Sequence, residues 1–228
     1  MSKQMHVHQQ EKPSVAETVM HFISRFRTVF IVVGIVIVAA VIAGFTIQHV
    51  RQSRIEASAE IAVQLNQSYQ QWLQAGDDEA GMFREQFMSA YNEATDRFSG
   101  MYAAELAEFL YGQISFAEQN YAEAAGIFSG LAGSADSHLA PLSAMNAAVA
   151  FEAAGDTDAA LEAYQELLQR FADRSPEAPR AQFALGRLNE DRDLQAAIAH
   201  YEDLIDAYPD SDWANLAESR IIHLRTVE

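Results

Sequence analysis

The longest apolar stretch of the chain runs from Val29 to Ile47, where 19 residues include no charged side chain and Thr46 carries the one polar group. A helix of this length covers roughly 28 Å, close to the ~30 Å hydrocarbon thickness of a bilayer. A core helix of a soluble protein would normally be shorter and show a polar face. The pattern therefore predicts a single transmembrane helix at residues 29–47.

The preceding segment, residues 1–28, is polar at first and then amphipathic. Ser14 and Glu17 match a capping box, which predicts that a short helix begins there and lies on the cytoplasmic leaflet. Its apolar positions fall at helical spacing: Val15, Val19, Phe22, Ile23 and Phe26. His6 and His8 lie on the polar tail, and two histidines without a third ligand do not indicate a metal site.

The charges beside the apolar stretch predict its orientation. Four basic residues precede it, Lys3, Lys12, Arg25 and Arg27, against Glu11 and Glu17, and this favours a cytoplasmic N-terminus. A cleaved signal peptide is the alternative, but its apolar region would be about 7–15 residues long and end at a small-x-small site. Residues 48–51 offer no such site. We expect an uncleaved anchor in the inner membrane of a bacterium, with the C-terminal domain in the periplasm.

Helical spacing continues beyond the membrane and predicts a membrane-proximal hairpin over residues 48–100. The first helix should end near Gly76 and a turn should occupy residues 76–78. Its apolar face is Ile55, Ala59, Ala62, Leu65, Tyr69 and Trp72; that of the second helix is Phe83, Phe87, Tyr91, Ala94 and Phe98. An aromatic stripe at this spacing is typical of core packing rather than of a cofactor site.

Residues 101–228 contain an internal repeat. Ala124, Phe128 and Leu131 recur as Ala160, Tyr164 and Leu167 and again as Ala197, Tyr201 and Leu204, at intervals of 36 and 37 residues. Each triplet should lie on the second helix of a hairpin, and the first helix brings a small residue, Gly112, Ala148 or Gly186, to the crossing. Small residues there allow two helices to approach closely.

These positions resemble those of tetratricopeptide repeats, in which a small residue, an alanine and an aromatic recur at these places. Together with the apolar stretch, the resemblance implies an all-α fold: one N-terminal transmembrane helix followed by a superhelix of antiparallel helix hairpins. It implies three repeats in residues 101–228, and Trp213, Leu216 and Ala217 would open a C-terminal capping helix.

The whole chain also resembles a family, the YfgM-type ancillary subunits of the bacterial SecYEG translocon. The order of basic tail, single anchor, degenerate first hairpin and acidic repeats carries this resemblance. The segment from Ala163 to Ser211 is similar to repeats of the cell-division coordinator CpoB and of the outer-membrane assembly lipoprotein BamD, although this chain has no cysteine for lipidation. The resemblance implies association with the translocon through the span and with a periplasmic chaperone through the repeats.

Charge and composition narrow the classes of function. From Arg51 onward the chain has eleven arginines, no lysine and thirty acidic residues, a net charge of −19. Such a field repels nucleic acid and anionic lipid. The sequence has no cysteine, phosphate-binding loop, H-E-x-x-H or G-x-S-x-G motif. We therefore expect a non-enzymatic scaffold with no catalytic residue, cofactor or metal. The alternative is an envelope or cell-division adaptor unconnected with export.

The resemblance also implies a concave wall made by the first helices of the repeats. Carried over, it consists of Leu106, Phe109, Gln113, Phe116, Leu142, Met145, Val149, Glu152, Arg180, Phe183, Arg187 and Glu190. We expect this wall to be an apolar groove for a partner protein, in which Arg180 and Arg187 hold a carboxylate. Alternatively, Phe109, Phe116 and Phe183 pack against neighbouring hairpins. The sequence does not indicate the oligomeric state.

Overall fold

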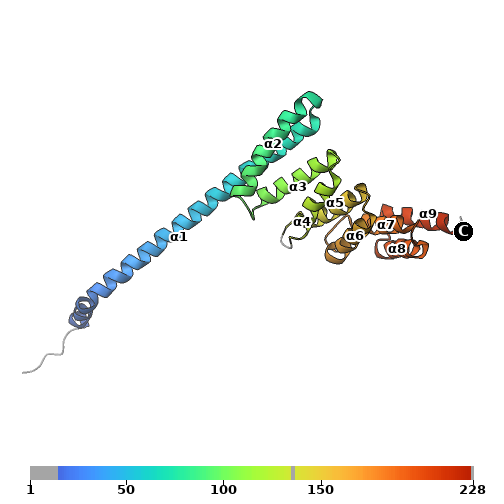
Figure 1. Cartoon of the computed structure of the whole chain (residues 1–228). Helices are drawn as coiled ribbons and strands as arrows, with labels where there is room; N and C mark the ends of the chain where they lie inside the picture. Colours follow the sequence, from blue (N-terminus) through green and yellow to red (C-terminus); the bar gives the residue numbers. More distant parts are fainter. Residues whose placement is uncertain (1–14, 135–136, 227–228) are drawn as a thin grey trace, which may run out of the picture. The chain divides into compact units, whose positions relative to one another are not determined.

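The structure is a computed structural model that describes residues 15–134 and 137–226. Within these ranges the chain folds into α-helices joined by short connections, without a strand (Figure 1). The helices are α1 Val15–Gln74, α2 Asp77–Arg97, α3 Tyr102–Ala117, α4 Tyr121–Ala132, α5 Ala140–Ala153, α6 Thr157–Phe171, α7 Ala178–Asn189, α8 Leu194–Ala207 and α9 Asp212–Thr226. The predicted all-α class is confirmed.

The chain divides into two units, Met1–Ile55 and Glu56–Glu228. In the first unit, the short helix predicted before the apolar stretch is not a separate element, because residues 15–28 and 29–47 are continuous in α1. No proline or glycine interrupts the sequence from Val15 to Phe30, so the helical hydrogen bonds continue. The predicted Ser14 cap and the histidines of the tail lie outside the described residues.

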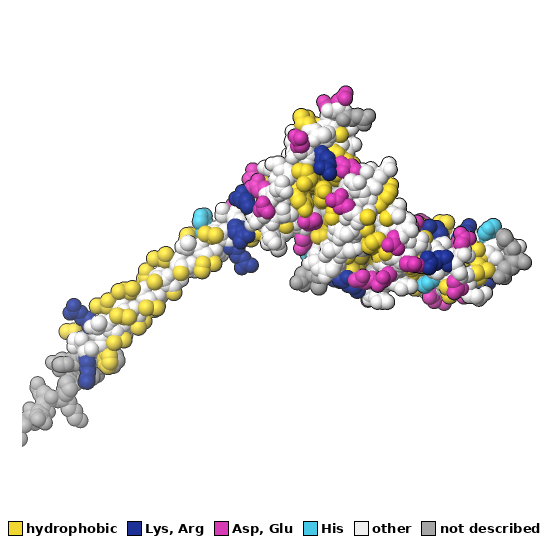
Figure 2. All heavy atoms as spheres, in the orientation of Figure 1, with side chains coloured by type: hydrophobic (Ala, Val, Ile, Leu, Met, Phe, Trp, Pro, Cys, Tyr) yellow, Lys and Arg dark blue, Asp and Glu magenta, His cyan; other side chains and the backbone are white. Residues whose placement is uncertain are grey.

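The apolar part of α1 is long and apolar enough to cross a membrane, and its most apolar window is not buried in the protein. Figure 2 shows hydrophobic side chains along this part of the helix, with arginines near both of its ends. A helix that is apolar all round and unburied is typical of a lipid-facing element.

In the second unit, the end of α1 packs against α2 through a core that includes Ile61, Leu65 and Phe87. Ile55 and Ala59 were predicted to face this core, but both are exposed. The buried face includes Ser58 and Ile61 instead, so it is rotated from the predicted one. The predicted turn at residues 76–78 is also shorter, because only Ala75 and Gly76 lie between the helices.

Three hairpins follow, α3–α4, α5–α6 and α7–α8, and the helices that adjoin in sequence pack against each other. All nine residues of the repeated triplets are buried: Ala124, Phe128, Leu131, Ala160, Tyr164, Leu167, Ala197, Tyr201 and Leu204. The small residue of each first helix lies against the aromatic ring of the second. A Cβ atom on Gly186 would lie 2.5 Å from Cε1 of Tyr201, and one on Gly112 would lie 2.8 Å from Cε1 of Phe128. The predicted repeat register is confirmed.

The turns of the later hairpins follow from local chemistry. Asp156 and Asp193 cap α6 and α8, because their side chains accept hydrogen bonds from the backbone N–H groups of Ala159 and Ala196. Gly155 adopts a φ of +81°, a conformation that is costly for residues with a Cβ. These caps fix the angle at which each second helix returns.

Helix α9 covers the last hairpin and contacts both α7 and α8. Ala214, Ala217 and Ile221 are buried in this contact, whereas Leu216 is 49% exposed. Thus α9 packs on the α7–α8 hairpin in the place that the first helix of a further repeat would take.

Candidate protein-binding groove

A cavity of about 330 Å³ opens between α5, α6, α7 and α9. Five residues of the predicted concave wall line it: Val149, Glu152, Arg180, Phe183 and Arg187. Four further lining residues were not predicted: Ala153, Tyr164, Ala184 and Trp213. Five of the six later residues of the predicted wall, all except Glu190, are therefore brought together around one hollow, which we call the groove.

The earlier half of the predicted wall is not an open apolar surface. Leu106 and Met145 are buried in the core, 5% and 1% exposed. Phe109 packs on Phe128 with ring centroids 5.7 Å apart, and Phe116 packs on Tyr121 at 5.1 Å. Both rings thus lie against the second helix of their own hairpin. Leu142 is exposed, and Gln113 is partly buried without lining the groove.

Arg187 already has a carboxylate partner within the protein. Its Nη2 donates to both oxygens of Glu152, at 2.8 and 2.7 Å, and the Tyr164 hydroxyl donates to the same carboxylate at 3.2 Å. Arg180 donates to Glu177 at 3.3 Å, and both of these side chains are partly exposed. The predicted pair of arginines therefore does not stand open for a ligand carboxylate, because Glu152 neutralises Arg187.

Tyr164 is held by this cluster and by burial. Burial raises the pKa of its hydroxyl, and the adjacent Glu152 raises it further. The hydroxyl therefore stays protonated and serves as a hydrogen-bond donor at neutral pH. The cluster connects α5, α6 and α7 at the back of the groove.

A second cluster of the same kind lies one hairpin further on. Glu190, which was predicted to face a partner, accepts hydrogen bonds from the Tyr201 hydroxyl at 2.5 Å and from Nε of Arg220 at 2.9 Å, and it also pairs with Nη2 of Arg220. Its side chain is 12% exposed. Glu190 therefore holds α9 to the α7–α8 hairpin rather than presenting a charge to solvent.

The first repeat hairpin, α3–α4, lacks such a tyrosine–glutamate pair. Its residues at the two positions show that the tyrosine and the glutamate occur together. The tyrosines lie 12 and 11 residues after their glutamates, in the pairs Tyr164–Glu152 and Tyr201–Glu190. The corresponding pair in α3–α4 is Phe128 and Phe116, which are both apolar. A phenylalanine has no hydroxyl, so a glutamate opposite it would lose a donor.

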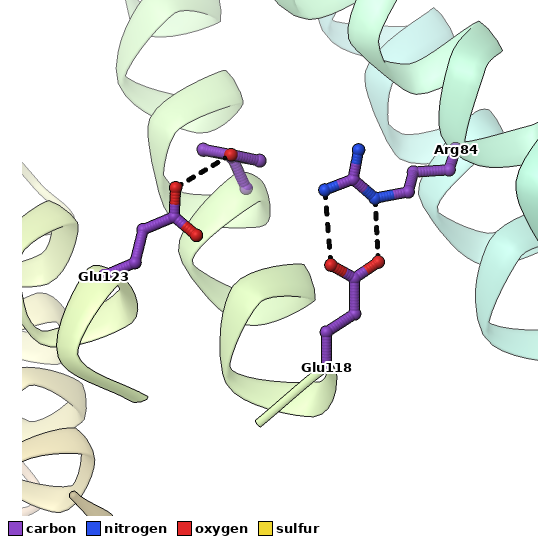
Figure 3. Close-up of polar contacts among 4 residues, drawn as sticks. Arg84, Glu118 and Glu123 are labelled. Carbon is purple, nitrogen blue, oxygen red and sulfur yellow. Dashed lines mark hydrogen bonds and ion pairs between the residues drawn. The ribbon is translucent and has the colours of Figure 1, made fainter. Parts of the chain in front are cut away.

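Other ion pairs join helices at the start of the array (Figure 3). Nε and Nη2 of Arg84 donate to the two carboxylate oxygens of Glu118 at 2.7 and 3.2 Å, which links α2 to the end of α3. The Tyr111 hydroxyl donates to Glu123 at 3.0 Å. These groups are satisfied by one another, as expected of structural contacts between neighbouring helices.

Among the residues that the structure describes, no three His, Asp or Glu side chains are grouped as a metal site would require. The clustered carboxylates of the groove are paired with arginine or tyrosine. The arrangement is suited to holding helices together and to binding a protein segment by shape.

Trp213 is one of the four lining residues that sequence reasoning missed. It was predicted only as the first residue of the capping helix, but its ring lies 5.2 Å from that of Phe183 and forms one wall of the groove. The repeat pattern could have predicted Trp213 as a wall residue, because α9 takes the place of a first helix and first helices make the concave wall. Tyr164 could not be expected there, since its position normally fills the crossing.

Residues 145–212 match the family model described as "Tetratricopeptide repeat". The match includes α6, α7, α8 and most of α5, and therefore nearly all of the groove. No curated protein matches the chain. This part of the chain is thus built of tetratricopeptide repeats, which act as protein-interaction scaffolds and present extended concave binding surfaces.

Proposed function

We propose that this protein is a membrane-anchored scaffold that holds partner proteins in the groove of its repeats. The observation that carries the proposal is the groove itself, a hollow with apolar and paired charged residues in the segment that matches tetratricopeptide repeats. Two other residues of the predicted wall, Leu142 and Gln113, lie outside the groove. A partner that extends beyond the groove would contact them.

The anchor is the apolar part of α1, residues 29–47. Its length, its uniform apolarity and the arginines at its ends support a single transmembrane helix. The excess of basic residues before it supports a cytoplasmic N-terminus and a periplasmic repeat domain. The resemblance of the whole chain to YfgM-type subunits supports a place beside the Sec translocon, where emerging chains meet periplasmic chaperones.

Proteolysis of spheroplasts tests the orientation. A protease added outside should remove the chain after about Arg54 and spare an epitope tag placed before Lys3, because the tag would lie in the cytoplasm. The same protease added to lysed cells should remove both parts and serves as the control. A protected C-terminus in intact spheroplasts would reverse the topology and exclude a periplasmic scaffold.

Blocking the groove tests the scaffold role. Ala153 lines the groove and is exposed at the end of α5, so Ala153→Arg should fill the opening without disturbing the core. Ala199→Arg on exposed α8 is the matched control. We expect the first variant to lose at least about tenfold in recovery of copurifying proteins, about 1.4 kcal/mol, and the second to behave as wild type.

Replacing residues 29–47 distinguishes partners that bind the span from partners that bind the groove. If residues 29–47 associate with the translocon, a variant with an unrelated apolar span should lose translocon subunits in affinity purification while proteins held by the groove remain. Equal recovery of translocon subunits with both spans would argue against lateral association through this helix. Unchanged recovery of every partner with Ala153→Arg would exclude the groove.

A further inference from the structure

The groove has an apolar wall on three helices. Val149 comes from α5, Phe183 and Ala184 from α7, and Trp213 from α9. Phe183 is 9% exposed and is fixed between the rings of Tyr201 and Trp213, at centroid distances of 5.3 and 5.2 Å. A rigid aromatic wall of this kind favours contact with another apolar side chain.

The charged groups beside this wall are already paired. Both oxygens of Glu152 accept from Arg187, and Arg180 pairs with Glu177. A charge brought into the groove would have to give up water and displace one of these partners, which is unfavourable. An apolar side chain of a partner meets no such cost, so the interior of the groove selects for it.

The charged residues that line the groove are Glu152, Arg180 and Arg187, so they do not make it acidic. The net charge of the chain beyond the apolar stretch acts instead on the residues that flank such a side chain. From Arg51 onward the chain carries a net charge of −19, without a lysine. Figure 2 shows acidic side chains distributed over the visible face of residues 56–228. A field of this sign attracts basic segments and repels acidic ones, and salt screens both effects.

We propose that the groove binds a partner segment through one large apolar side chain flanked by basic residues, and that Trp213 of the capping helix is the wall that selects this side chain. The proposal rests on the scaffold function above and specifies the chemistry of its ligand. It gives α9 a role in recognition in addition to packing on the α7–α8 hairpin.

Tryptophan fluorescence can report the occupant directly. The chain has two tryptophans, so Trp72→Phe leaves Trp213 as the only one. Full-length protein in detergent would be titrated with three amidated peptides: one with a phenylalanine between lysines, a second with serine in place of the phenylalanine, and a third with glutamates in place of the lysines. Peptides without tryptophan do not contribute to the emission.

The first peptide should give a saturable change in Trp213 emission. The other two should bind at least about tenfold more weakly, and raising the salt from about 0.1 M to about 0.5 M should weaken the first. Ala153→Arg should abolish the response, whereas Ala199→Arg should not. Equal binding of the serine peptide would show that charge alone acts, and preferred binding of the glutamate peptide would show that Arg180 recognises a carboxylate.

Either of those results, or no response to any peptide, overturns the proposal. The scaffold function is judged separately, because it depends on the loss of copurifying proteins with Ala153→Arg. If that loss occurs while the basic peptide fails to bind, the groove is a binding site for a segment of different chemistry.

Discussion

Gly112 and Gly186 determine how closely the helices of their hairpins approach. In each case a ring of the second helix occupies the volume that a side chain would need. Tyr201 is fully buried, and its hydroxyl is bound to Glu190, so the ring has little room to move. The small residue is therefore a packing requirement rather than a turn requirement.

We expect Gly186→Ala to lower the free energy of unfolding by about 1–3 kcal/mol, because the added methyl group would overlap Tyr201. Gly126→Ala in α4 is the matched control, since no atom lies within 4 Å of its Cβ position. That variant should be more stable by about 0.5–1 kcal/mol through helix propensity. Urea unfolding measures both, and equal effects of the two substitutions would refute the crossing contact.

Ser143 places a polar group at a buried position where the packing does not require one. Its side chain is fully buried in α5, and its Oγ has no hydrogen-bond partner among the described residues. Ser143→Ala should raise the free energy of unfolding by about 1 kcal/mol, because the unfolded chain can hydrate the hydroxyl. Ser219→Ala, at an exposed position of α9, controls for propensity and should gain less. A destabilised Ser143→Ala protein would indicate a partner for the hydroxyl.

At the scale of elements, the carboxylate of Glu190 contributes a pH-dependent part to the attachment of α9. Burial acts to raise the pKa of Glu190, but the hydrogen bonds from Arg220 and Tyr201 and the charges of Arg220 and Arg187 outweigh it, so the pKa lies below the ordinary value of 4.5. The unfolded chain then binds a proton at a higher pH than the folded chain. Stability from this group is present above about pH 4.5 and is lost as the pH falls through the folded pKa.

Hydrogen exchange of residues 212–226 should therefore speed up as the pH is lowered from about 6 to about 3, after correction for intrinsic exchange. Glu190→Gln should exchange faster at pH 6 and respond less to pH, because its side chain does not titrate. Glu202→Gln removes the exposed pair with Arg225, which also joins α8 to α9, and should keep the wild-type response. If all three proteins showed the same pH response, the pH dependence of exchange in α9 would arise from titratable groups other than Glu190.

The elements and the crossings could be predicted from the sequence because they depend on short spacings. Ala160, Tyr164 and Leu167 lie within two turns of one helix, and periodicity alone places them on one face. The pairing of Glu152 with Arg187 spans 35 residues and depends on how two hairpins are rotated against each other. With thirty acidic residues and eleven arginines, spacing does not select a pair, and the groove residues were therefore predicted without their partners.

At the scale of the whole molecule, the repeat domain has its own core. The buried cluster that includes the α1–α2 hairpin begins at Ile61, and the boundary between the two units falls after Ile55. We expect a fragment of residues 56–228 to unfold within a few degrees of the full-length protein in detergent, because the removed part contributes no residue to this core. Melting followed by circular dichroism tests this, with Gly186→Ala in both proteins as an internal reference. A much lower melting temperature of the fragment would show that residues 1–55 stabilise the domain.

The difference between the first hairpin and the later two limits how such an array can change in length. Tandem repeats are gained and lost by recombination, which moves whole hairpins. If the second hairpin were deleted, the equivalence of the repeats would place Arg187 beside Phe116, which has no carboxylate to replace that of Glu152. The contact between two adjacent hairpins is thus specific for that pair of hairpins. We therefore expect this array to evolve by substitution within hairpins and to retain the number and order of its hairpins.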